Sequence, residues 1–501
     1  MYQLYRDRPR FILAIVLANI ALSLWSISLD SIVNNDGITY LTMAELFANG
    51  DWQTAQGYYN WPFYPLFIAG ISKVFFIDVS SAAYALNTFL ATSMTLAFIA
   101  IVGELSNNDR KILVIAAIVI LLFPSITKYR PYIIRDFGYL SCYLWSLYFI
   151  FRFCNSLHKK HLIGWILAAG LSCLFRFEGI VLLLVAPYFL LVFSAKKIPH
   201  RKKILTSLSV TLIAFSAVVI SWYLKNKYAA NIQIAQQSGQ DINNVFELFL
   251  NNINQQFNNH RSGLFAYLTA ASNNVGGVLY DLVRRMAVFY FFICLFAYYK
   301  GYGLHNRLIK RVWLVYLFTN FFVLVGFSYI NNLLVSRYSM ATALTLLLLA
   351  PFALEKLLTQ MKSFTKSGRI ASAFLIVLLI YVSIDGLNVR TKKAHFRTAG
   401  DWLNANLHKG ETVFSNDRLL VFYAKQGPKS NFIDQFTNPQ LWSHIKTGAI
   451  RRYDYIALSL TPNSKLEDDF RQTLWYHFGR PVNIIEGRKG RTVFIYRTAK
   501  N

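Results

Sequence analysis

The 501-residue sequence is poor in charged residues and in cysteine, and each shortage excludes a class of protein. Only 15% of its residues are charged, whereas soluble globular proteins usually have about 25%. The four cysteines all lie in or beside apolar runs, and their spacing matches neither a disulfide framework nor a set of metal ligands. We therefore expect no disulfide scaffold and no cofactor, and nothing in the spacing supports a divalent metal. Asn-x-Ser/Thr sequons are also absent, which favours a bacterial envelope over the lumen of the endoplasmic reticulum.

Apolar residues, in contrast, are abundant and lie in long runs. They make up 55% of the chain, and 16% of the residues are aromatic. Runs of about 18–20 apolar residues, each long enough to cross a bilayer, recur from near the N-terminus to residue 386. The sequence therefore predicts an α-helical polytopic membrane protein with about eleven transmembrane helices. The predicted spans are residues 11–29, 81–103, 112–127, 137–153, two within 162–194, 204–224, 279–299, 312–330, 339–355 and 370–386.

Three segments between or within these runs are interpreted separately. Pro62–Ile77 is apolar but short and begins with proline, so we expect a helix lying in the membrane interface. The stretch 162–194 is too long for one helix, and we divide it at Arg176–Gly179. Residues 225–278 are rich in Asn and Gln and are predicted to form a polar loop.

The net charge of +27 is distributed in a pattern that indicates topology. Most Lys and Arg residues fall in alternate short loops between apolar runs, which places those loops in the cytoplasm and leaves the C-terminus outside. We therefore expect a multi-pass protein of the bacterial inner membrane, with a cytoplasmic N-terminus and a periplasmic C-terminus. Basic loop residues contact anionic membrane lipids, so no nucleic-acid binding is expected.

The chain divides into two predicted domains. Residues 1–389 form the transmembrane domain, which includes a long outer loop at 30–80. Residues 390–501 are predicted to form a small soluble α/β domain on the outer face. Its pattern indicates helices at 396–408, 417–425 and 463–477, strands at ETVFS and YDYIALSL, and a hairpin in NIIEGRKGRTVFIYR that turns at Arg488–Gly490.

The first outer loop holds the strongest candidate for a catalytic residue. Asp36 follows the first span closely, with Asn35 before it and Tyr40 shortly after it. A carboxylate in this position could take a proton from an acceptor hydroxyl as that hydroxyl attacks a sugar carbon. The alternative is that Asp36 caps a helix that begins near Ile38.

Further charged residues are predicted to share the outer side of the membrane with Asp36. Charges at membrane depth are costly, and arginine binds phosphate oxygens in pairs, so this set suggests phosphate binding beside a nucleophile. The alternatives are ion pairs at helix ends and side chains that reach toward lipid headgroups. The set comprises Arg130, Arg135, Asp136, Arg176, Glu178, Arg284, Arg285 and Arg337.

Five motifs resemble those of the GT-C glycosyltransferases, in particular the aminoarabinose-transferase and protein O-mannosyltransferase branch. They are NNDGITYLTMAELFANGDW, NWPFYPLFIAG, RPYIIRDFGYL, FRFEG and SRYSMATALTLLLLAP. The layout of the whole chain is also similar, with an acid just after the first span and a soluble domain at the end.

The resemblance implies transfer of a sugar from a polyprenyl-phosphate donor to a lipid, glycan or protein acceptor, with inversion, at the outer face of the membrane. Asp36 would be the base, and Arg135, Arg337, Arg176 and Arg130 would bind the donor phosphate. The remaining candidates would support them, namely Asp136, Glu178, Asn35 and Tyr40. Many members have two adjacent acids where this chain has Asn35-Asp36, a departure that argues against a metal here.

Other functions are compatible with the same residues. A transporter or flippase of a lipid-linked sugar would also need outer arginines and an apolar groove, although its spans should contain more polar residues and often a repeat. A ligase or polymerase that uses a lipid-pyrophosphate glycan would catalyse the same class of reaction. A structural assembly protein that acts through its tail would leave the outer charges unexplained.

Overall fold

The computed structural model describes most of the chain in several segments. These are residues 8–30, 32–59, 61–183, 263–331, 337–360, 366–387, 393–408, 410–424, 445, 447–460, 465–487 and 491–498. The predicted span 204–224, the part of 162–194 beyond residue 183, residues 225–262 of the polar loop and the turn Arg488–Gly490 lie outside these segments.

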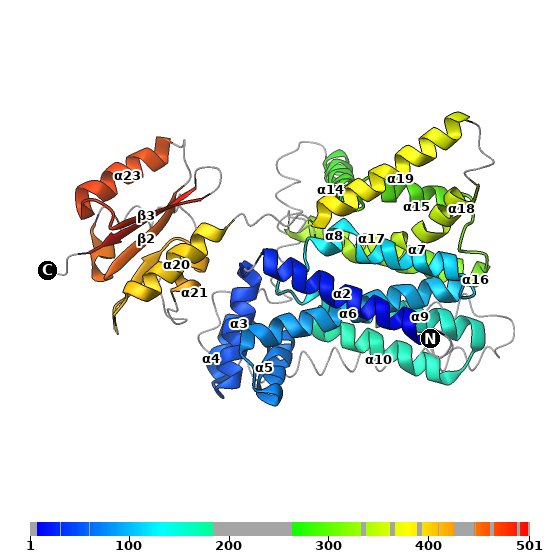
Figure 1. Ribbon diagram of the computed structural model, residues 1–501, viewed down its shortest axis with the longest axis horizontal. Helices are drawn as coiled ribbons and strands as arrows, with labels where there is room; N and C mark the ends of the chain where they lie inside the picture. Colours follow the sequence, from blue (N-terminus) through cyan, green and yellow to red (C-terminus); the bar gives the residue numbers. More distant parts are fainter. Residues whose placement is uncertain are drawn as a thin grey trace.

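A bundle of long helices makes up most of the described chain, with a smaller sheet-containing region at one end of it (Figure 1). In the described segments, five helices are long and apolar enough to cross a membrane: Pro9–Leu29, Val79–Leu105, Arg307–Tyr329, Met340–Thr359 and Gly368–Leu387. These results support an integral membrane protein, while the total of about eleven spans stays a prediction. The helices of the bundle are α2 (Pro9–Leu29), α6 (Val79–Leu105), α7 (Arg110–Leu121), α8 (Pro124–Thr127), α9 (Asp136–Ser156), α10 (Lys159–Phe175), α14 (Gly263–Arg285), α15 (Phe289–Tyr299), α16 (Arg307–Asn331), α17 (Met340–Leu347), α18 (Ala350–Gln360) and α19 (Lys366–Leu387).

Local sequence explains where several of these helices begin. The side chain of Asp78 accepts the backbone N–H of Ser81 at the start of α6, and Asp109 accepts those of Lys111 and Ile112 at the start of α7. An acid in this position satisfies N–H groups that have no partner within the helix. The helices therefore start where the apolar runs meet a capping acid.

Two predicted spans are divided between two helices, which corrects the prediction of single helices there, and a third contains a short turn. Span 112–127 ends as α7 at Leu121, and Pro124 begins the short helix α8, because proline cannot continue the hydrogen bonding of a preceding helix. Span 279–299 is divided between α14 and α15, where Ala287 and Val288 have positive φ values of 51° and 54°. In span 339–355 a short turn separates α17 from α18, but Met340–Thr359 as a whole is long and apolar enough to cross a membrane, as predicted.

Helix α14 also corrects the prediction of a continuous polar loop over residues 225–278. It begins at Gly263, within the stretch that the Asn-rich composition had suggested as a loop. Its alternation of polar and apolar residues suits a helix with one face against the bundle, a pattern that overall composition does not reveal.

Three helices form the outer loop that follows α2. They are α3 (Asn35–Ala48), α4 (Trp52–Tyr58) and α5 (Phe63–Phe75), and they lie together at one end of the bundle (Figure 1). Helix α5 confirms the short helix expected within Pro62–Ile77. Its C-terminal end exposes Val74, Phe75 and Phe76, an apolar tip of the kind that enters a membrane interface.

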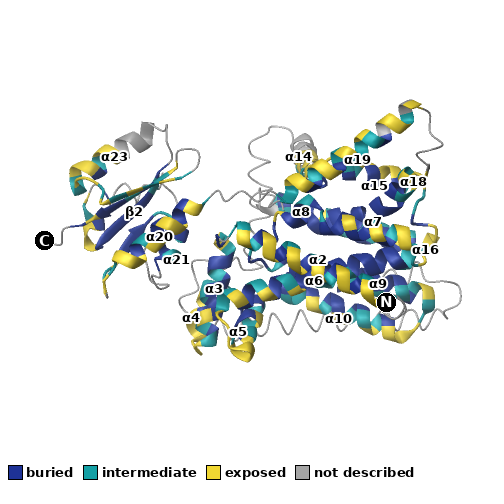
Figure 2. Ribbon diagram, in the orientation of Figure 1, coloured by how far each residue is buried: buried dark blue, intermediate teal, exposed yellow. Residues whose placement is uncertain are grey.

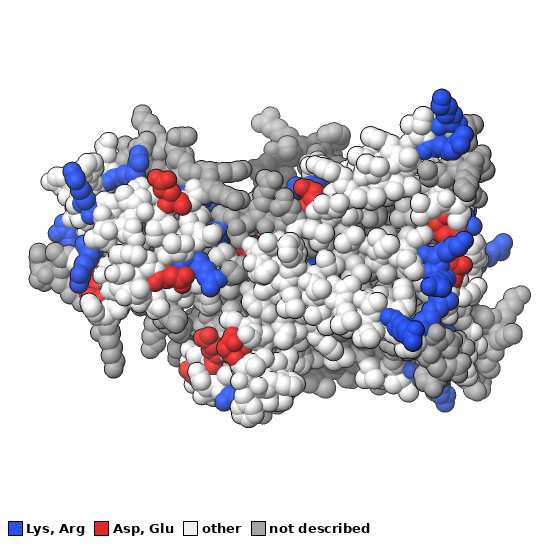
Figure 3. Space-filling model, viewed as in Figure 1, with Lys and Arg blue, Asp and Glu red and all other residues white. Residues whose placement is uncertain are grey.

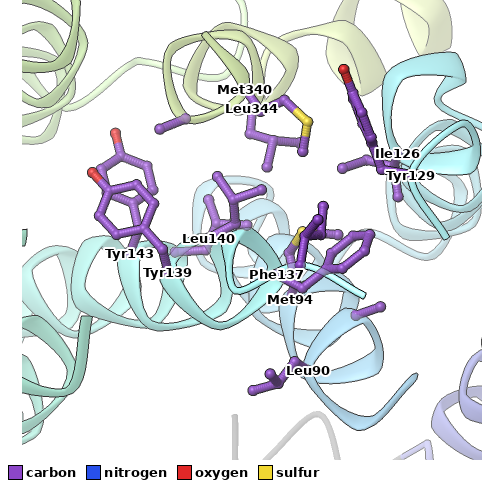
Figure 4. Close-up of a cluster of buried hydrophobic side chains, with 14 of the residues drawn as sticks. Leu90, Met94, Ile126, Tyr129, Phe137, Tyr139, Leu140, Tyr143, Met340 and Leu344 are labelled. Atoms are coloured by element: carbon purple, nitrogen blue, oxygen red, sulfur yellow. The ribbon is translucent and has the colours of Figure 1, made fainter. Parts of the chain in front are cut away.

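The core of the bundle lies around α9, which packs against α6, α10, α16 and α17. Phe137 and Leu140 of α9 face Met94 of α6 and Met340 and Leu344 of α17 (Figure 4). Figure 2 shows buried residues along the inward faces of these helices, whereas α19 exposes much of its length. An apolar helix exposed in this way suits contact with lipid rather than water.

Helices α9 and α10 approach each other closely at one glycine. A Cβ on Gly138 would lie 2.2 Å from the ring of Phe175, so any larger residue here would separate the two helices. This contact brings the start of α9 beside the end of α10, where Arg135 and Arg176 lie.

The C-terminal region contains a four-stranded sheet with the strand order β1-β2-β4-β3. Strands β1 and β2 are parallel, and β4 is antiparallel to both β2 and β3. Every helix and strand predicted for this region is present within a few residues of its expected position. The elements are α20 (Ala394–Asn406), β1 (Val413–Ser415), α21 (Arg418–Tyr423), the 3₁₀ helix η3 (Ala449–Arg452), β2 (Tyr455–Leu460), α23 (Lys465–Phe478), β3 (Asn483–Glu486) and β4 (Thr492–Arg497).

Charged residues are distributed unevenly over the molecule (Figure 3). Lys and Arg gather at the end of the bundle away from the C-terminal region, while the middle of the visible face is almost free of charge. The opposite end, which holds α3, α4 and the C-terminal region, carries charges of both signs. The candidate functional residues lie at this mixed end.

Candidate active site

Asn34 fixes the entry into the helix that carries Asp36. Its side-chain oxygen accepts the backbone N–H of Ile133 at 2.8 Å, and its amide nitrogen donates to the carbonyl of Ile133 at 3.3 Å. Helix α3 then begins at Asn35, so the expected start near Ile38 is wrong, and Asp36 lies in the first turn rather than at the cap. The carboxylate is favoured there because the positive end of the helix dipole lies beside it.

Gly37 allows this close packing. A Cβ on Gly37 would lie 2.9 Å from both Asn34 Oδ1 and Val33 Cγ1, and 3.1 Å from Ile133 Cβ. Any side chain would therefore push α3 away from the segment that leads into α9. The glycine after Asp36 sets the position of the acid relative to Arg135 and Asp136.

Five charged side chains form one continuous network at the end of the bundle that holds α3. Arg337 forms an ion pair with Asp36, and its Nε lies 3.6 Å from Asp136 Oδ2. Asp136 Oδ1 accepts from Arg176 at 2.5 Å. Arg176 also binds Glu178, with Nε 3.3 Å from Glu178 Oε2. Sequence reasoning selected all five residues, and the structure brings them together from α3, α9, the turn after α10 and the segment before α17.

Burial and charge act in opposite directions on Glu178, which lies outside the spans in the turn after α10. Burial alone would raise the pKa of Glu178, but the adjacent Arg176 guanidinium outweighs it and holds that pKa below its usual value. Glu178 is therefore ionised at neutral pH, as the network requires.

Arg135 differs from Arg176 and Arg337 because no carboxylate in the described part of the chain lies within 4.0 Å of it. Its guanidinium lies over the ring of Tyr59, 5.2 Å from the centroid. Burial raises the pKa of Tyr59, against the opposing effect of Arg135, so the phenol does not neutralise the arginine. Arg135, at the start of α9, thus contacts Tyr59 and forms no salt bridge with a described carboxylate.

Tyr40 and Asn35 supplement the cluster to different degrees. Tyr40 is buried, and its ring lies 5.0 Å from Tyr64 and 6.3 Å from Tyr59. It therefore supports the aromatic layer beneath Arg135. Asn35 is exposed at the start of α3 and contributes through its backbone to the helix that carries Asp36.

A pocket opens beside this network, with one polar and one apolar wall. Arg176, Glu178, Asn320 and the tyrosines 139 and 338 supply the polar wall, and Val323, Leu324 and Phe327 of α16 supply the apolar wall. The ring of Tyr338 lies 3.8 Å from the Arg176 guanidinium.

Asp281 was missed by sequence reasoning, although it holds the segment that contains Arg337. Its Oδ2 accepts the hydroxyl of Ser339 at 2.7 Å, and its Oδ1 lies 3.3 Å from Arg285 Nε. Asp281 and Arg285 both lie at the start of the predicted span 279–299, and their i,i+4 spacing is the signal that could have selected Asp281 beside Arg285. Arg285 therefore holds Asp281, which binds the residue before α17, and it does not line the pocket. Arg284 is exposed.

Among the described residues, Arg130 binds groups outside the network, and its assignment to the donor phosphate stays a prediction that these contacts do not support. Its side chain is buried, with the residue 2% exposed, and NH1 donates to Asn19 Oδ1 at 2.9 Å and to Ser23 Oγ at 3.0 Å. NH2 donates to the carbonyl of Leu121, the last residue of α7, at 3.3 Å. Arg130 thus joins α2 to the negative end of the α7 dipole and is not exposed to a ligand.

Among the residues that the structure describes, no group of three or more His, Cys, Asp or Glu side chains gathers in a way that could hold a metal ion.

Comparison with known proteins identifies the fold. The family model for dolichyl-phosphate-mannose-protein mannosyltransferases matches residues 60–222, about a third of the chain. No curated protein matches the sequence significantly. ArnT from Cupriavidus metallidurans in the apo state matches the structure with a TM-score of 0.56 and 14% identity, over 98% of both chains.

Two further solved structures have the same arrangement. ArnT from the same organism bound to undecaprenyl phosphate matches with a TM-score of 0.53 and 11% identity, over 97% of this chain and 98% of that one. An Archaeoglobus fulgidus oligosaccharyltransferase tethered to an acceptor peptide matches with a TM-score of 0.51 and 11% identity, over 99% of this chain and 75% of that one. The resemblance to GT-C glycosyltransferases is therefore confirmed, and at these identities it establishes the fold.

Proposed function

We propose that this chain is an inverting glycosyltransferase that moves a sugar from a polyprenyl-phosphate donor to an acceptor hydroxyl or amide at the outer face of the membrane. The observation that carries the proposal is the network from Asp36 to Glu178, which lies beside a pocket with a charged wall and an apolar wall. The GT-C fold and the match to a mannosyltransferase family model support it.

In the proposed reaction, arginines hold the donor phosphate. Arg135 has a charge that no described carboxylate neutralises, and Arg337 lies between Asp36 and Asp136. As the bond between the sugar C1 and the phosphate oxygen breaks, the electron pair leaves with the polyprenyl phosphate. The arginines stabilise the charge that grows on this leaving group. Arg176, which is buried and paired with two acids, orients Asp136 and Glu178 rather than binding phosphate.

Asp36 acts on the acceptor from the opposite face of the sugar. The acceptor oxygen or nitrogen forms the new bond to C1 while its proton passes to the Asp36 carboxylate, which inverts the configuration at C1. Asp36 suits this role because its side chain keeps 38% of its surface exposed while Arg337 orients it. A base must be both accessible to the acceptor and held in place.

We propose the orientation that the sequence predicts, with the N-terminus in the cytoplasm and the C-terminal region in the periplasm of a bacterium. The concentration of Lys and Arg at one end of the bundle supports this orientation, because basic loops remain on the cytoplasmic side. Helix α3, which carries Asp36, and the C-terminal region share the other end.

The donor and acceptor classes follow from the proposed chemistry. A polyprenyl chain would continue from the pocket along the apolar wall of α16, and one ArnT structure holds undecaprenyl phosphate. The acceptor is a lipid, a glycan or a protein, and the oligosaccharyltransferase structure holds an acceptor peptide.

The test is a transfer assay in proteoliposomes with radiolabelled polyprenyl-phosphate sugars and a host envelope extract as acceptor. We expect Asp36→Asn to lower transfer at least about 100-fold while expression and membrane insertion remain intact, since it removes the base. Asp51→Asn is the matched control because Asp51 lies in the same outer loop and only caps α4 through Thr54.

Wild-type transfer by Asp36→Asn would remove Asp36 as the base. Label that crosses the bilayer without a new product, in both the wild type and the variant, would contradict the transferase and indicate a flippase.

A further inference from the structure

A hydroxyl of the C-terminal region binds the backbone of the segment that leads to Asp36. The backbone N–H of Val33 donates to Tyr423 Oη at 2.9 Å, although 390 residues separate the two positions. Val33 is buried in the extended segment between α2 and α3, three residues before Asp36. The backbone on the approach to Asp36 is therefore anchored partly by a residue of α21.

Tyr423 is itself held firmly within the C-terminal region. A Cβ on Gly400 of α20 would lie 2.2 Å from Tyr423 Cβ, so the tyrosine backbone packs directly against that helix. The Arg397 guanidinium lies 5.8 Å from the centroid of its ring. The hydroxyl thus projects from a packed helix pair rather than from a free side chain.

Other contacts show that the hydroxyl is part of a wider junction. Helix α21 packs against α3. Asp30, at the end of α2, lies close enough to Lys393 for the two charges to interact. Tyr58, at the end of α4, interacts electrostatically with Arg418 in the same way. The junction therefore meets the outer loop both before and after the helix that carries Asp36.

Two anchors meet on consecutive residues of the approach segment. Asn34 binds both backbone groups of Ile133, which joins the segment to the start of α9, and Val33 binds Tyr423. The first anchor is internal to the bundle, and the second comes from the C-terminal region. Because Gly37 has no side chain, the start of α3 packs directly against Asn34 and Val33 of this segment.

We infer that Tyr423 is a positioning residue through which the C-terminal region sets the orientation of Asp36 relative to Arg337. The inference rests on the proposed transferase function and extends it, because it gives the C-terminal region a direct part in turnover. Asp36 must meet the acceptor within a narrow range of distance and angle, and small displacements of a base cost large factors in rate.

Tyr423→Phe tests the inference because it removes only the hydroxyl and keeps the ring packed against α20. Loss of one hydrogen bond can lower the population of correctly oriented Asp36 about tenfold, so we expect kcat to fall about tenfold. The donor KM should stay unchanged. Hydrogen exchange in the peptide that contains Val33 should rise in the same variant, since its N–H loses its acceptor.

Tyr455→Phe is the matched control. The hydroxyl of Tyr455 donates to the carbonyl of Asn406 at 3.4 Å, so this variant removes a bond that lies wholly within the C-terminal region. It should reproduce any loss of thermal stability in that region without changing kcat or the exchange of the Val33 peptide.

Each outcome decides the inference. Faster exchange together with a lower kcat in Tyr423→Phe, and neither in Tyr455→Phe, supports it. An unchanged kcat in Tyr423→Phe overturns it, whether or not exchange rises, as does an equal fall of kcat in both variants. A wild-type protein that transfers no sugar overturns the proposed function and this inference together, whereas an active wild type with a fully active Tyr423→Phe overturns the inference alone.

Discussion

Two arginine sites at the same end of the bundle differ in their partners. Arg176 and Arg337 are neutralised by Asp36, Asp136 and Glu178, and Arg176 and Glu178 line a pocket. Arg130 is as buried as Arg176, but its hydrogen bonds in the described part of the chain go to neutral groups, namely a side-chain amide, a hydroxyl and backbone carbonyls.

The difference separates a candidate catalytic site from a structural contact. Arg176 and Glu178 line a pocket, so a substrate can reach the network to which they belong. An arginine bonded to neutral groups in a closed site satisfies a helix end and has no route to a ligand. The comparison can be tested by removing each arginine and asking whether stability or donor use changes.

The largest expected effect comes from Arg176→Met, which leaves the buried Asp136 and its neighbour Glu178 without their shared partner. Breaking a buried ion pair from one side costs about 3–5 kcal/mol of folding stability. Arg130→Met removes bonds to neutral groups only and should cost less, about 1–3 kcal/mol. Thermal unfolding of both variants in detergent micelles measures the difference.

A charge-compensated variant serves as the control for this prediction. Adding Glu178→Gln to Arg176→Met removes one of the stranded acids and should recover part of the lost stability. If Arg130→Met proved the more destabilising of the two single variants, the claim that unpaired Asp136 and Glu178 cost the most stability would be wrong.

A smaller effect is expected from Arg337→Ala, this time on donor use. Loss of a charged hydrogen-bond partner for the donor phosphate should raise the donor KM about tenfold or more and leave the acceptor KM near its wild-type value. Steady-state transfer at varied donor and acceptor concentrations measures both constants. Arg130→Met should leave the donor KM unchanged; a raised donor KM in that variant would return Arg130 to the donor site.

The smallest effect concerns pH. Because Arg176 holds the pKa of Glu178 below its unfolded value near 4.5, the ionised acid stabilises the fold above that pH. This contribution is lost as the pH falls below about 4.5 toward the folded pKa, since the unfolded chain then binds the extra proton. Unfolding temperatures measured from pH 6 downward should fall less steeply in Glu178→Gln than in the wild type. Equal slopes would show that Glu178 does not contribute to this acid sensitivity.

The fold could be predicted from the sequence where one local pattern decides the structure. The apolar runs that became α2, α6 and α16, and the alternating strands of the C-terminal region, lie close to their expected positions. The breaks at Pro124 and at Val288 were missed, because length and hydropathy describe a run without locating an interruption inside it. Hydropathy likewise did not reveal α14, whose apolar residues are spread through a polar stretch.

The candidate site could be predicted only in part for a related reason. Counting charges on one side of the membrane selected Asp36, Asp136 and Arg337, which the structure places in contact. The same count included Arg130, because a sequence does not show whether an arginine faces a pocket or a helix end. The bonds made by Asn34 and Tyr423 depend on distant backbone atoms, and no local pattern encodes them.

The pairing of Asp36 with Arg337 has a consequence for how the protein is made. The two residues are 301 positions apart, so most of the bundle must enter the membrane before the acid meets its arginine. Tyr423 follows later still in synthesis. The first helices are therefore inserted before Asp36 has its arginine and before the Val33 N–H has its tyrosine hydroxyl. A nascent chain stalled before residue 337 cannot assemble the reaction centre.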